Sequence, residues 1–165
     1  MNMKRNGFSF VEMLIVVTMI IVLTTGGLVY INKFNSQQKI EATKRDLVAS
    51  LQMARNYAKT KQQPPNYDVT LVYVEVRLTT DGNLVVGANG VGATYFSKDI
   101  TATGVTVTAT DLYFDAYNGK LVNVDEGNIT PIDFGSPVRI EIGSSEGIGD
   151  IKVVEIKSSG LINEN

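Results

Sequence analysis

An uncharged apolar run near the amino terminus limits what this chain can become more than any other feature of its 165 residues. The run is Met13 to Ile31, nineteen residues without a charge, and Phe8 to Val11 extend it upstream. About 20 helical residues, each rising ~1.5 Å, cross the ~30 Å apolar core of a bilayer. We therefore expect one membrane-spanning helix over residues 8–31. The alternative is an ordinary signal peptide or simple signal anchor, with Lys4 and Arg5 as its basic start and residues 24–27 as a small-residue cleavage site.

One carboxylate, Glu12, interrupts the beginning of this apolar segment. An ionised carboxylate near the centre of a bilayer costs ~2.5–3.5 kcal/mol, so an acid inside such a run is by default a functional residue with a partner. If the chain were cut between Gly7 and Phe8, Glu12 would lie four residues after the new amino terminus, one helical turn along. In an assembly of parallel helices, its carboxylate could pair with the α-amine of a neighbour. Because one stagger between helices satisfies this pair, Glu12 would also set their register.

The helical pattern continues beyond the apolar run. Residues 32–62 contain no glycine or proline and are rich in helix-forming residues. An apolar stripe at helical spacing lies on one face, with charges on the other faces. The stripe consists of Ile40, Leu47, Leu51, Ala54 and Ala58, with Val48 beside it. We expect one helix over residues 8–62, ended by Pro64–Pro65, with Gly26 and Gly27 as its weak point and a candidate bend.

After Pro65 the apolar pattern changes to a period of two, which is typical of strands. Asp81–Gly82–Asn83 and Asn118–Gly119 predict hairpin turns, the second a turn of two residues. Eight strands are expected, over residues 69–79, 84–88, 94–97, 105–109, 112–116, 120–124, 138–142 and 151–156. The sequence thus predicts an α+β fold, a long amino-terminal helix packed on a carboxy-terminal antiparallel β-sandwich or strongly curved sheet.

Composition argues against most enzymatic chemistry. The chain has no histidine and no cysteine, which removes imidazole and thiolate catalysis and the metal sites built from these residues. No spacing indicates a carboxylate pair for hydrolysis, and Gly87, Gly90 and Gly92 lie in a loop that opens no helix, so no phosphate site is expected. The acidic cluster over residues 125–128 lacks the spacing of a calcium loop and is interpreted as a solvated loop. We expect no enzyme activity, no cofactor and no metal.

The net charge of −2 conceals two regions of opposite sign. Residues 32–62 carry seven basic and two acidic side chains, whereas residues 63–165 carry six basic and fourteen acidic ones. The acidic carboxy-terminal region argues against nucleic acid as a partner, since binding it requires clustered, accessible basic groups. Three tyrosines near predicted turns, Tyr67, Tyr95 and Tyr117, are the candidates there for contact with a ligand.

Residues 4–17, KRNGFSFVEMLIVV, resemble the class III leader of type IV pilins and type II secretion pseudopilins. In that family a short basic leader ends in glycine, a phenylalanine follows, and a glutamate stands at the fifth mature position before an aliphatic run. The resemblance implies cleavage after Gly7 by prepilin peptidase, N-methylation of Phe8 by the same enzyme, and assembly through Glu12. It implies other pilin or pseudopilin subunits and an inner-membrane assembly platform as further partners. The chain would be a single-pass protein of the cytoplasmic membrane before assembly, and then part of a filament with its β-domain outside the cytoplasm.

Three further segments are similar to the GspH/FimT group of minor pilins and pseudopilins. Residues 50–58 close the helix, residues 112–121 form a strand that turns at a glycine, and residues 152–160 form a last strand with a closing glycine. The implied function is that of a structural subunit, a minor pilin or pseudopilin of a type IV pilus or type II secretion filament. The alternatives are a DNA-uptake pilin, and a membrane-anchored or secreted β-domain binding protein with no filament role.

The resemblance divides the chain into four parts. These are a leader over residues 1–7, a transmembrane and assembly helix over 8–31, an amphipathic stem helix over 32–63 and a globular β-domain over 64–165. Many pilins have a helix-bending proline in the apolar helix and a disulfide near the carboxy terminus, and this chain has neither. Basic residues flank both ends of the apolar run, so the positive-inside rule does not orient the chain, and its orientation rests on the resemblance.

Overall fold

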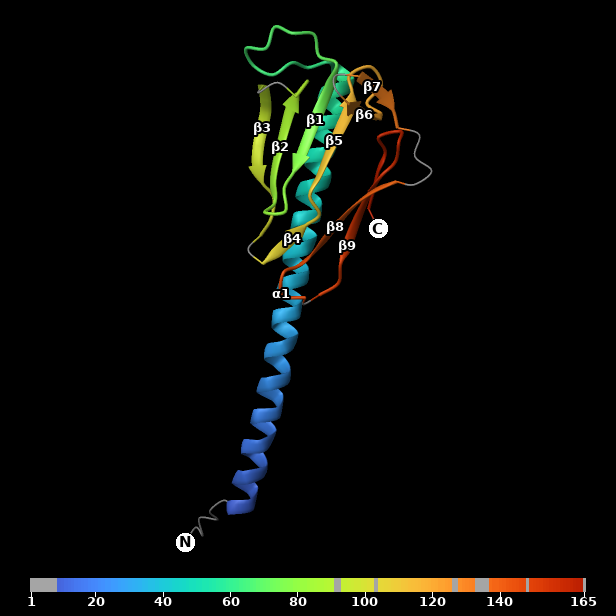
Figure 1. Cartoon of the computed structure of the whole chain (residues 1–165). Coiled ribbons are helices and arrows are strands. Elements are labelled where there is room, and N and C mark those ends of the chain that lie inside the picture. The colour runs from blue at the N-terminus through green and yellow to red at the C-terminus, as the bar shows by residue number, and fades with distance from the viewer. Residues whose placement is uncertain are drawn as a thin grey trace. The chain divides into compact units, whose positions relative to one another are not determined.

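The computed structural model describes residues 9–90, 93–102, 104–125, 128–132, 137–147 and 149–164, and of residues 26–29 and 164 it describes the backbone alone. The chain divides into two compact units, with the division between Asn35 and Ser36. Helix α1, Phe10–Thr60, belongs to both units (Figure 1). The second unit, residues 36–165, is called the body below.

Helix α1 ends at Thr60 in a Schellman motif, in which the residue after the helix adopts the left-handed conformation. Lys61 has a φ of 52°, and the N–H groups of residues 61 and 62 donate back to helix carbonyls at 3.1 and 3.0 Å. The helix predicted over residues 8–62 is therefore two residues too long at this end, because the capping turn stops it before Pro64–Pro65. The predicted start at Phe8 lies outside the described residues.

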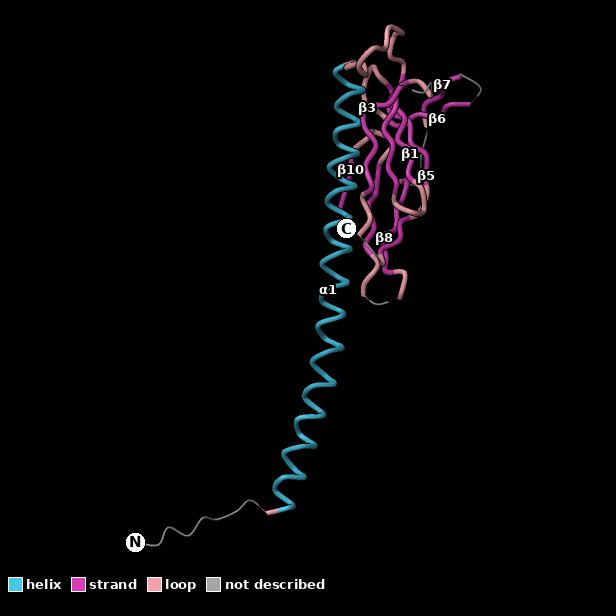
Figure 2. Tube along the Cα trace, turned by 90° about the vertical axis from the view of Figure 1, so that its left-hand side faces the viewer, coloured by secondary structure: helices cyan, strands magenta, loops and turns pink. Residues whose placement is uncertain are grey.

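Within the described residues, ten strands form two antiparallel sheets. Their bounds are β1 Tyr73–Leu78, β2 Asn83–Ala88, β3 Ala93–Asp99, β4 Val105–Val107, β5 Thr110–Asp115, β6 Leu121–Asp125, β7 Asn128–Pro131, β8 Val138–Ser144, β9 Lys152–Ile156 and β10 Ile162–Glu164. The six-stranded sheet has the order β3-β2-β1-β5-β6-β7, and the four-stranded sheet has the order β10-β9-β8-β4. Figure 2 shows the second half of α1 alongside the strands. The predicted fold class, a long amino-terminal helix packed on antiparallel sheets, is confirmed.

All eight predicted strands are present with shifted bounds, and β7 and β10 were not predicted. β10 has three residues, and β7 has four, is largely exposed and ends in Pro131. Neither strand is long or apolar enough to show an alternating pattern. The segment over residues 152–160, expected to contain the last strand, is followed by β10.

The strand predicted over residues 69–79 begins only at Tyr73. The side chain of Asn89 forms hydrogen bonds with backbone groups of residues 70, 72 and 73, at and before this start. Asn89 Oδ1 accepts hydrogen bonds from the N–H groups of Val72 and Tyr73 at 2.8 and 3.1 Å. Asn89 Nδ2 donates to the Thr70 carbonyl at 2.8 Å. These bonds take the place of ladder bonds on one side of residues 70–72, while on the other side the Val72 carbonyl still accepts from the Ala116 N–H at 2.9 Å.

The two-residue turn predicted at Asn118–Gly119 is part of a four-residue loop. The Asp115 N–H donates to the Lys120 carbonyl at 2.9 Å, which leaves residues 116–119 in the loop. A two-residue type I′ turn needs positive φ at both central residues, and of this pair Gly119 alone has it, at 65°. The turn predicted at residues 81–83 does join β1 to β2.

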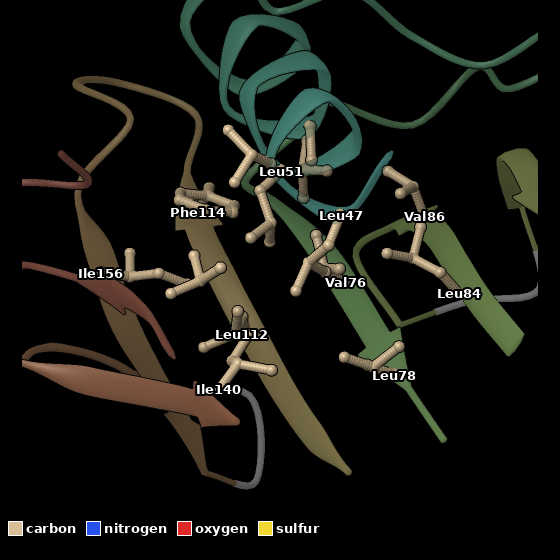
Figure 3. Close-up of a cluster of buried hydrophobic side chains, with 14 of the residues drawn as sticks. Leu47, Leu51, Val76, Leu78, Leu84, Val86, Leu112, Phe114, Ile140 and Ile156 are labelled. Carbon is tan, nitrogen blue, oxygen red and sulfur yellow. The ribbon is translucent and has the colours of Figure 1, made fainter. Parts of the chain in front are cut away.

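The core of the body consists of one face of α1 and the inward faces of both sheets. The predicted helix stripe is buried throughout, with Ile40, Leu47, Val48, Leu51, Ala54 and Ala58 at most 5% exposed. Figure 3 shows Phe114 of β5 beside Leu51 of this stripe, with Ile140 and Ile156 from the smaller sheet nearby. Lys44 departs from the prediction that charges lie on the exposed faces, because it is 7% exposed. Its four-carbon stem can cover apolar surface in a way that a shorter charged side chain cannot.

A joint around Arg55 links α1 to loops of both sheets. The Arg55 guanidinium donates from Nε to the Gly119 carbonyl at 3.3 Å and from Nη2 to the Ser159 carbonyl at 3.1 Å. Gly160 has a φ of 74°, and a Cβ added there would lie 2.1 Å from the Gly119 carbonyl oxygen. The three segments that are similar to GspH/FimT proteins therefore meet at this joint.

Candidate assembly site

Glu12 lies in the first turn of α1, and its side chain is exposed. The helix is hydrogen-bonded from its first turn, since the Met13 N–H donates to the Ser9 carbonyl at 3.1 Å. A carboxylate in this turn lies near the positive end of the helix dipole. Gly7 and Phe8, the predicted processing residues, lie outside the described residues. Pairing of Glu12 with an amino terminus therefore stays a prediction.

The side chains that follow Glu12 form an apolar surface around the whole helix. Every described side chain from Phe10 to Thr25 is exposed, and the large apolar ones among them are 49–80% exposed. Helix α1 contains a stretch long and apolar enough to cross a membrane, and none of that stretch is buried inside the protein. A helix that is apolar on all sides is stable only when a membrane or other helices surround it.

The polar side chains of this stretch are satisfied locally. The Thr18 hydroxyl contacts the carbonyl oxygens of residues 14 and 15 at 3.0 and 2.8 Å, and Thr24 and Thr25 donate to carbonyls one turn back, each at 2.7 Å. Such bonds let a hydroxyl enter an apolar medium without an outside partner. Among the described residues, no hydrogen bond or ion pair to the Glu12 carboxylate is found. Glu12 is therefore the group in this stretch that needs a partner from elsewhere.

Gly26 and Gly27 lie within the bounds of α1, close to the division between the two units. Glycine weakens a helix by about 1 kcal/mol relative to alanine, and two in a row mark a point where the helix can unwind or bend. A bend at this point in an assembly stays a prediction.

The body carries a charged cluster on the outer face of the six-stranded sheet. Glu75 is 8% exposed, its Oε1 accepts a hydrogen bond from Arg77 Nη2 at 2.7 Å, and Arg77 Nε lies 3.7 Å from Asp111 Oδ1. This hydrogen bond and the charge of Glu75 raise the pKa of Arg77, and burial raises the pKa of Tyr73 and Tyr113. The hollow beside Glu75 has a volume of about 110 Å³. With every charge paired, we interpret the cluster as an ion-pair network of the sheet.

The candidate ligand contacts in the body differ in their environment. Tyr95 stacks on Tyr57 with ring centroids 4.5 Å apart, its hydroxyl donates to the Gln62 carbonyl, and burial raises its pKa to about 12. Tyr67 is partly buried against the core. Tyr117 is 79% exposed, which makes it the one of the three predicted tyrosines that is free to meet a partner.

Within the part of the body that the structure describes, the remaining predicted features form no site. Residues 125 and 128 are paired at the ends of the β6–β7 hairpin, while residues 126 and 127 lie outside the described part. Gly87 lies in β2 and Gly90 in the turn after it, and Gly92 also falls outside the described part. Across the described residues, no group of three or more acidic side chains is arranged to hold a metal ion.

Arg55, Gly119 and Gly160 belong to the three segments that are similar to GspH/FimT proteins, but their contact is not predicted from sequence. The available signal was the pair of glycines that follow strands, because a glycine needed for close backbone approach marks a contact. The two glycines are 41 positions apart, and Arg55 lies 64 positions before Gly119, and a single sequence does not indicate contacts at such separations.

No model of a known protein family matches the chain, and no curated protein sequence matches it. Two solved structures with a similar fold are those of the type IV minor pilin FimU of Pseudomonas aeruginosa, in two crystal forms. The first has a TM-score of 0.55 and 20% identity and covers 80% of this chain and 92% of the FimU chain. The second has a TM-score of 0.52 and 19% identity and covers 76% and 91%. At this identity the likeness concerns the fold, and the chain has a type IV pilin-like fold.

Proposed function

We propose that this chain is a structural subunit of a pilus-type filament, a minor pilin or pseudopilin of GspH/FimT type, and that it is not an enzyme. The observation that carries the proposal is an apolar helical stretch, uncovered by its own chain and holding one carboxylate, attached to a body with a pilin-like fold. Such a stretch needs a membrane before assembly and neighbouring helices after it. The helix serves both environments because both are apolar.

The proposed pathway begins with insertion of residues 8–31 in the cytoplasmic membrane as a single span, with the β-domain outside the cytoplasm. Prepilin peptidase then removes residues 1–7 after Gly7 and methylates the amine of Phe8. Residues 32–63 serve as the stem and residues 64–165 as the globular domain exposed on the filament. An inner-membrane assembly platform then moves the subunit from the bilayer into contact with other pilin or pseudopilin subunits.

Glu12 supplies the direction and register of this step. Leaving an ionised carboxylate unpaired inside an apolar helix bundle costs ~2.5–3.5 kcal/mol, by analogy with a bilayer interior. A neighbour's terminal amine at the correct stagger removes that cost, and other staggers leave it in place. The difference selects one register over the alternatives by roughly a factor of 100.

Mass spectrometry of the mature amino terminus tests the processing step. A chain that begins at N-methylated Phe8 supports the proposal. An intact Met1, or a cut within residues 24–27, contradicts it and points instead to the signal-anchor or secreted alternative.

Filament incorporation tests the role of the carboxylate. Glu12→Ala should abolish recovery of the chain in sheared filaments while the protein still accumulates in the membrane. Val16→Ala is the matched control, because Val16 lies one turn along the same helix face and its truncation removes apolar contact without touching a charge. If Glu12→Ala filaments contain the chain at the level of Val16→Ala filaments, the proposed role of Glu12 is wrong.

A further inference from the structure

Lysines gather at the end of the body where α1 finishes, and we call them the basic end. They are Lys59 and Lys61 at the end of α1, Lys120 after the β5–β6 loop and Lys157 after β9, and all four are exposed. Their placement is fixed by contacts. The Lys59 stem lies over Gly119, since a Cβ added at Gly119 would meet Lys59 Cγ at 2.7 Å. The Lys61 amine lies 4.2 Å from the centre of the exposed Tyr117 ring. Two carboxylates neighbour the group, Asp115, which is half-buried, and Asp68 in the loop after α1.

Carboxylates gather in loops at the other end of the body, and we call them the acidic end. They are Asp81 in the β1–β2 turn, Asp99 at the end of β3, and Glu146 and Asp150 in the β8–β9 loop, and all four are exposed. Thr101 ties two of these loops together, because its N–H donates to Asp99 Oδ1 and its hydroxyl to the Asp81 carbonyl, both at 3.0 Å. Gln37 Nε2 donates to Asp150 Oδ2 at 3.2 Å, which holds the third loop against α1. Residues 79–83, 99–104 and 144–151 contain no lysine or arginine.

The two groups lie at opposite ends of the body. In Figure 1 the β8–β9 loop is at its lower end, the β1–β2 turn lies above that loop at the lower end of β1 and β2, and the end of α1 and the β5–β6 loop are at its upper end. Near the lower end, Lys98 pairs with Asp46 at 3.0 Å and Arg45 with Glu41 at 3.9 Å, and Lys39 and Lys44 also have partners. Lys152, which is half-buried, begins β9 directly after the third loop. The four carboxylates of the acidic end outnumber this lysine, so the acidic loops attract cations from outside the chain.

We propose that the bodies of two copies of this chain contact each other head to tail, the basic end of one against the acidic end of the next. The inference rests on the proposed function. A head-to-tail contact uses a different patch on each partner, so it can repeat from copy to copy, as a filament subunit requires. Contacts of that kind do not close on themselves as a twofold dimer does, and they build open filaments unless the rotation between copies closes a ring.

Charge complementarity is the reason for choosing a second copy as the partner. The body, residues 36–165, carries sixteen acidic and twelve basic side chains, so two bodies with this net negative charge repel in most orientations. The head-to-tail orientation is the one that places the lysines of one body against carboxylates of another. Tyr117 supplies a large apolar contact at the centre of the basic end, as buried aromatic residues do in protein interfaces.

Zero-length cross-linking of the full chain in filaments, or in membranes of cells that produce it, tests the contact. A carbodiimide joins an amine to a carboxylate only where the two already touch. Mass spectrometry should identify links from Lys59, Lys61 or Lys120 to Glu146 or Asp150. A mixture of isotope-labelled and unlabelled chains should give mixed links, which shows that they join separate molecules. Raising the salt from 0.05 to 0.5 M should lower the yield several-fold, because the charges are exposed and screened.

Charge reversal identifies the residues. The triple variant Lys59→Glu, Lys61→Glu, Lys120→Glu should lower the yield of these links, measured on remaining lysines and by dimer recovery, about tenfold. Adding Asp81→Lys, Glu146→Lys and Asp150→Lys should restore dimer recovery. Ala49→Lys is the control, since Ala49 is exposed on α1, ten residues before Lys59 and twelve after Gln37, and so away from both groups of loops. Tyr117→Ala should weaken the contact and Tyr117→Phe should retain it. Far-UV circular dichroism checks that each variant is folded.

The outcomes separate this contact from the proposed function. If the chain enters filaments and carries N-methylated Phe8 but gives links between other surfaces, the head-to-tail contact is wrong and the filament role stands. If dimer recovery falls in the triple variant and the reversed acidic end fails to restore it, the partner of the basic end is another protein and the inference is overturned. If the wild-type chain is never found in a filament, the proposed function is wrong, and the head-to-tail contact, which rests on it, is overturned with it.

Discussion

Replacing Gly160 with alanine tests the joint around Arg55 that holds α1 to both sheets. Gly160 has a φ of 74°, and a side chain in this left-handed conformation costs about 1–2 kcal/mol. The new Cβ would lie 2.1 Å from the Gly119 carbonyl oxygen and 3.0 Å from Arg55 Nε. Because the nearer atom belongs to the backbone, it cannot rotate away, and the β9–β10 turn must move.

The magnitude follows from the bonds that this turn carries. Moving it breaks the hydrogen bond from Arg55 Nη2 to the Ser159 carbonyl and the one from the Leu121 N–H to the Ser158 carbonyl, each 3.1 Å long. A hydrogen bond of this kind contributes about 0.5–1.5 kcal/mol net. Together with the backbone term, Gly160→Ala should lower the free energy of unfolding by about 3 kcal/mol.

Gly147→Ala is the matched control. Gly147 has a similar φ of 68°, and a Cβ added there meets nothing within 4 Å, so the backbone term acts alone at about 1 kcal/mol. Urea unfolding of residues 36–165, followed by circular dichroism, measures both variants, since the hydrophobic core lies wholly within these residues. Equal destabilisation by the two substitutions would refute the reasoning, because it would mean that the close approach at Gly160 is relieved without cost.

Three further predictions concern the body. Phe114→Ala should lower the free energy of unfolding by about 3–5 kcal/mol in the same urea assay, because Phe114 is fully buried; a loss below about 1 kcal/mol would contradict its place in the core. For Tyr95, the folded chain keeps its proton up to a pKa of about 12 while the unfolded chain loses it near 10, so stability should fall as pH rises from 10 to 12, and Tyr95→Phe should show a smaller fall in unfolding measurements across this range. Lys98→Ala, which removes the ion pair with Asp46, should change the free energy of unfolding by less than about 1 kcal/mol, since both side chains are 49% exposed; a larger loss would show a coupled network.

The second half of α1 could be predicted from sequence because its signal is local. A buried helix face repeats every three or four residues, and the stripe that includes Leu47 and Leu51 follows that repeat throughout. The ends of elements could not be predicted in the same way, because they depend on contacts made elsewhere. The hydrogen bonds of the Asn89 side chain place the start of β1 at Tyr73, and nothing in the sequence of residues 69–72 indicates this contact.

The candidate sites also differ in whether their sequence signal is local or depends on contacts made by the fold. Glu12 stands out from sequence because a charge in an apolar run is anomalous whatever the fold. The Arg55 joint and the two charged ends depend on which loops the sheets bring together. Lys120 and Lys157 are 37 positions apart, and only the fold places both near the end of α1.

The Arg55 joint also sets the order in which this protein can acquire its structure. Arg55 is synthesised 64 residues before Gly119 and 104 residues before Ser159. At a synthesis rate of about 5–20 residues per second, α1 waits about 5–20 s for the last of these partners. Until β1, β2 and β5 have been made, its apolar stripe has no sheet to cover it, so a chaperone or the membrane surface can bind there. A chain truncated before Ser159 therefore keeps the strands that cover the stripe but lacks the bond that ties α1 to the β9–β10 turn.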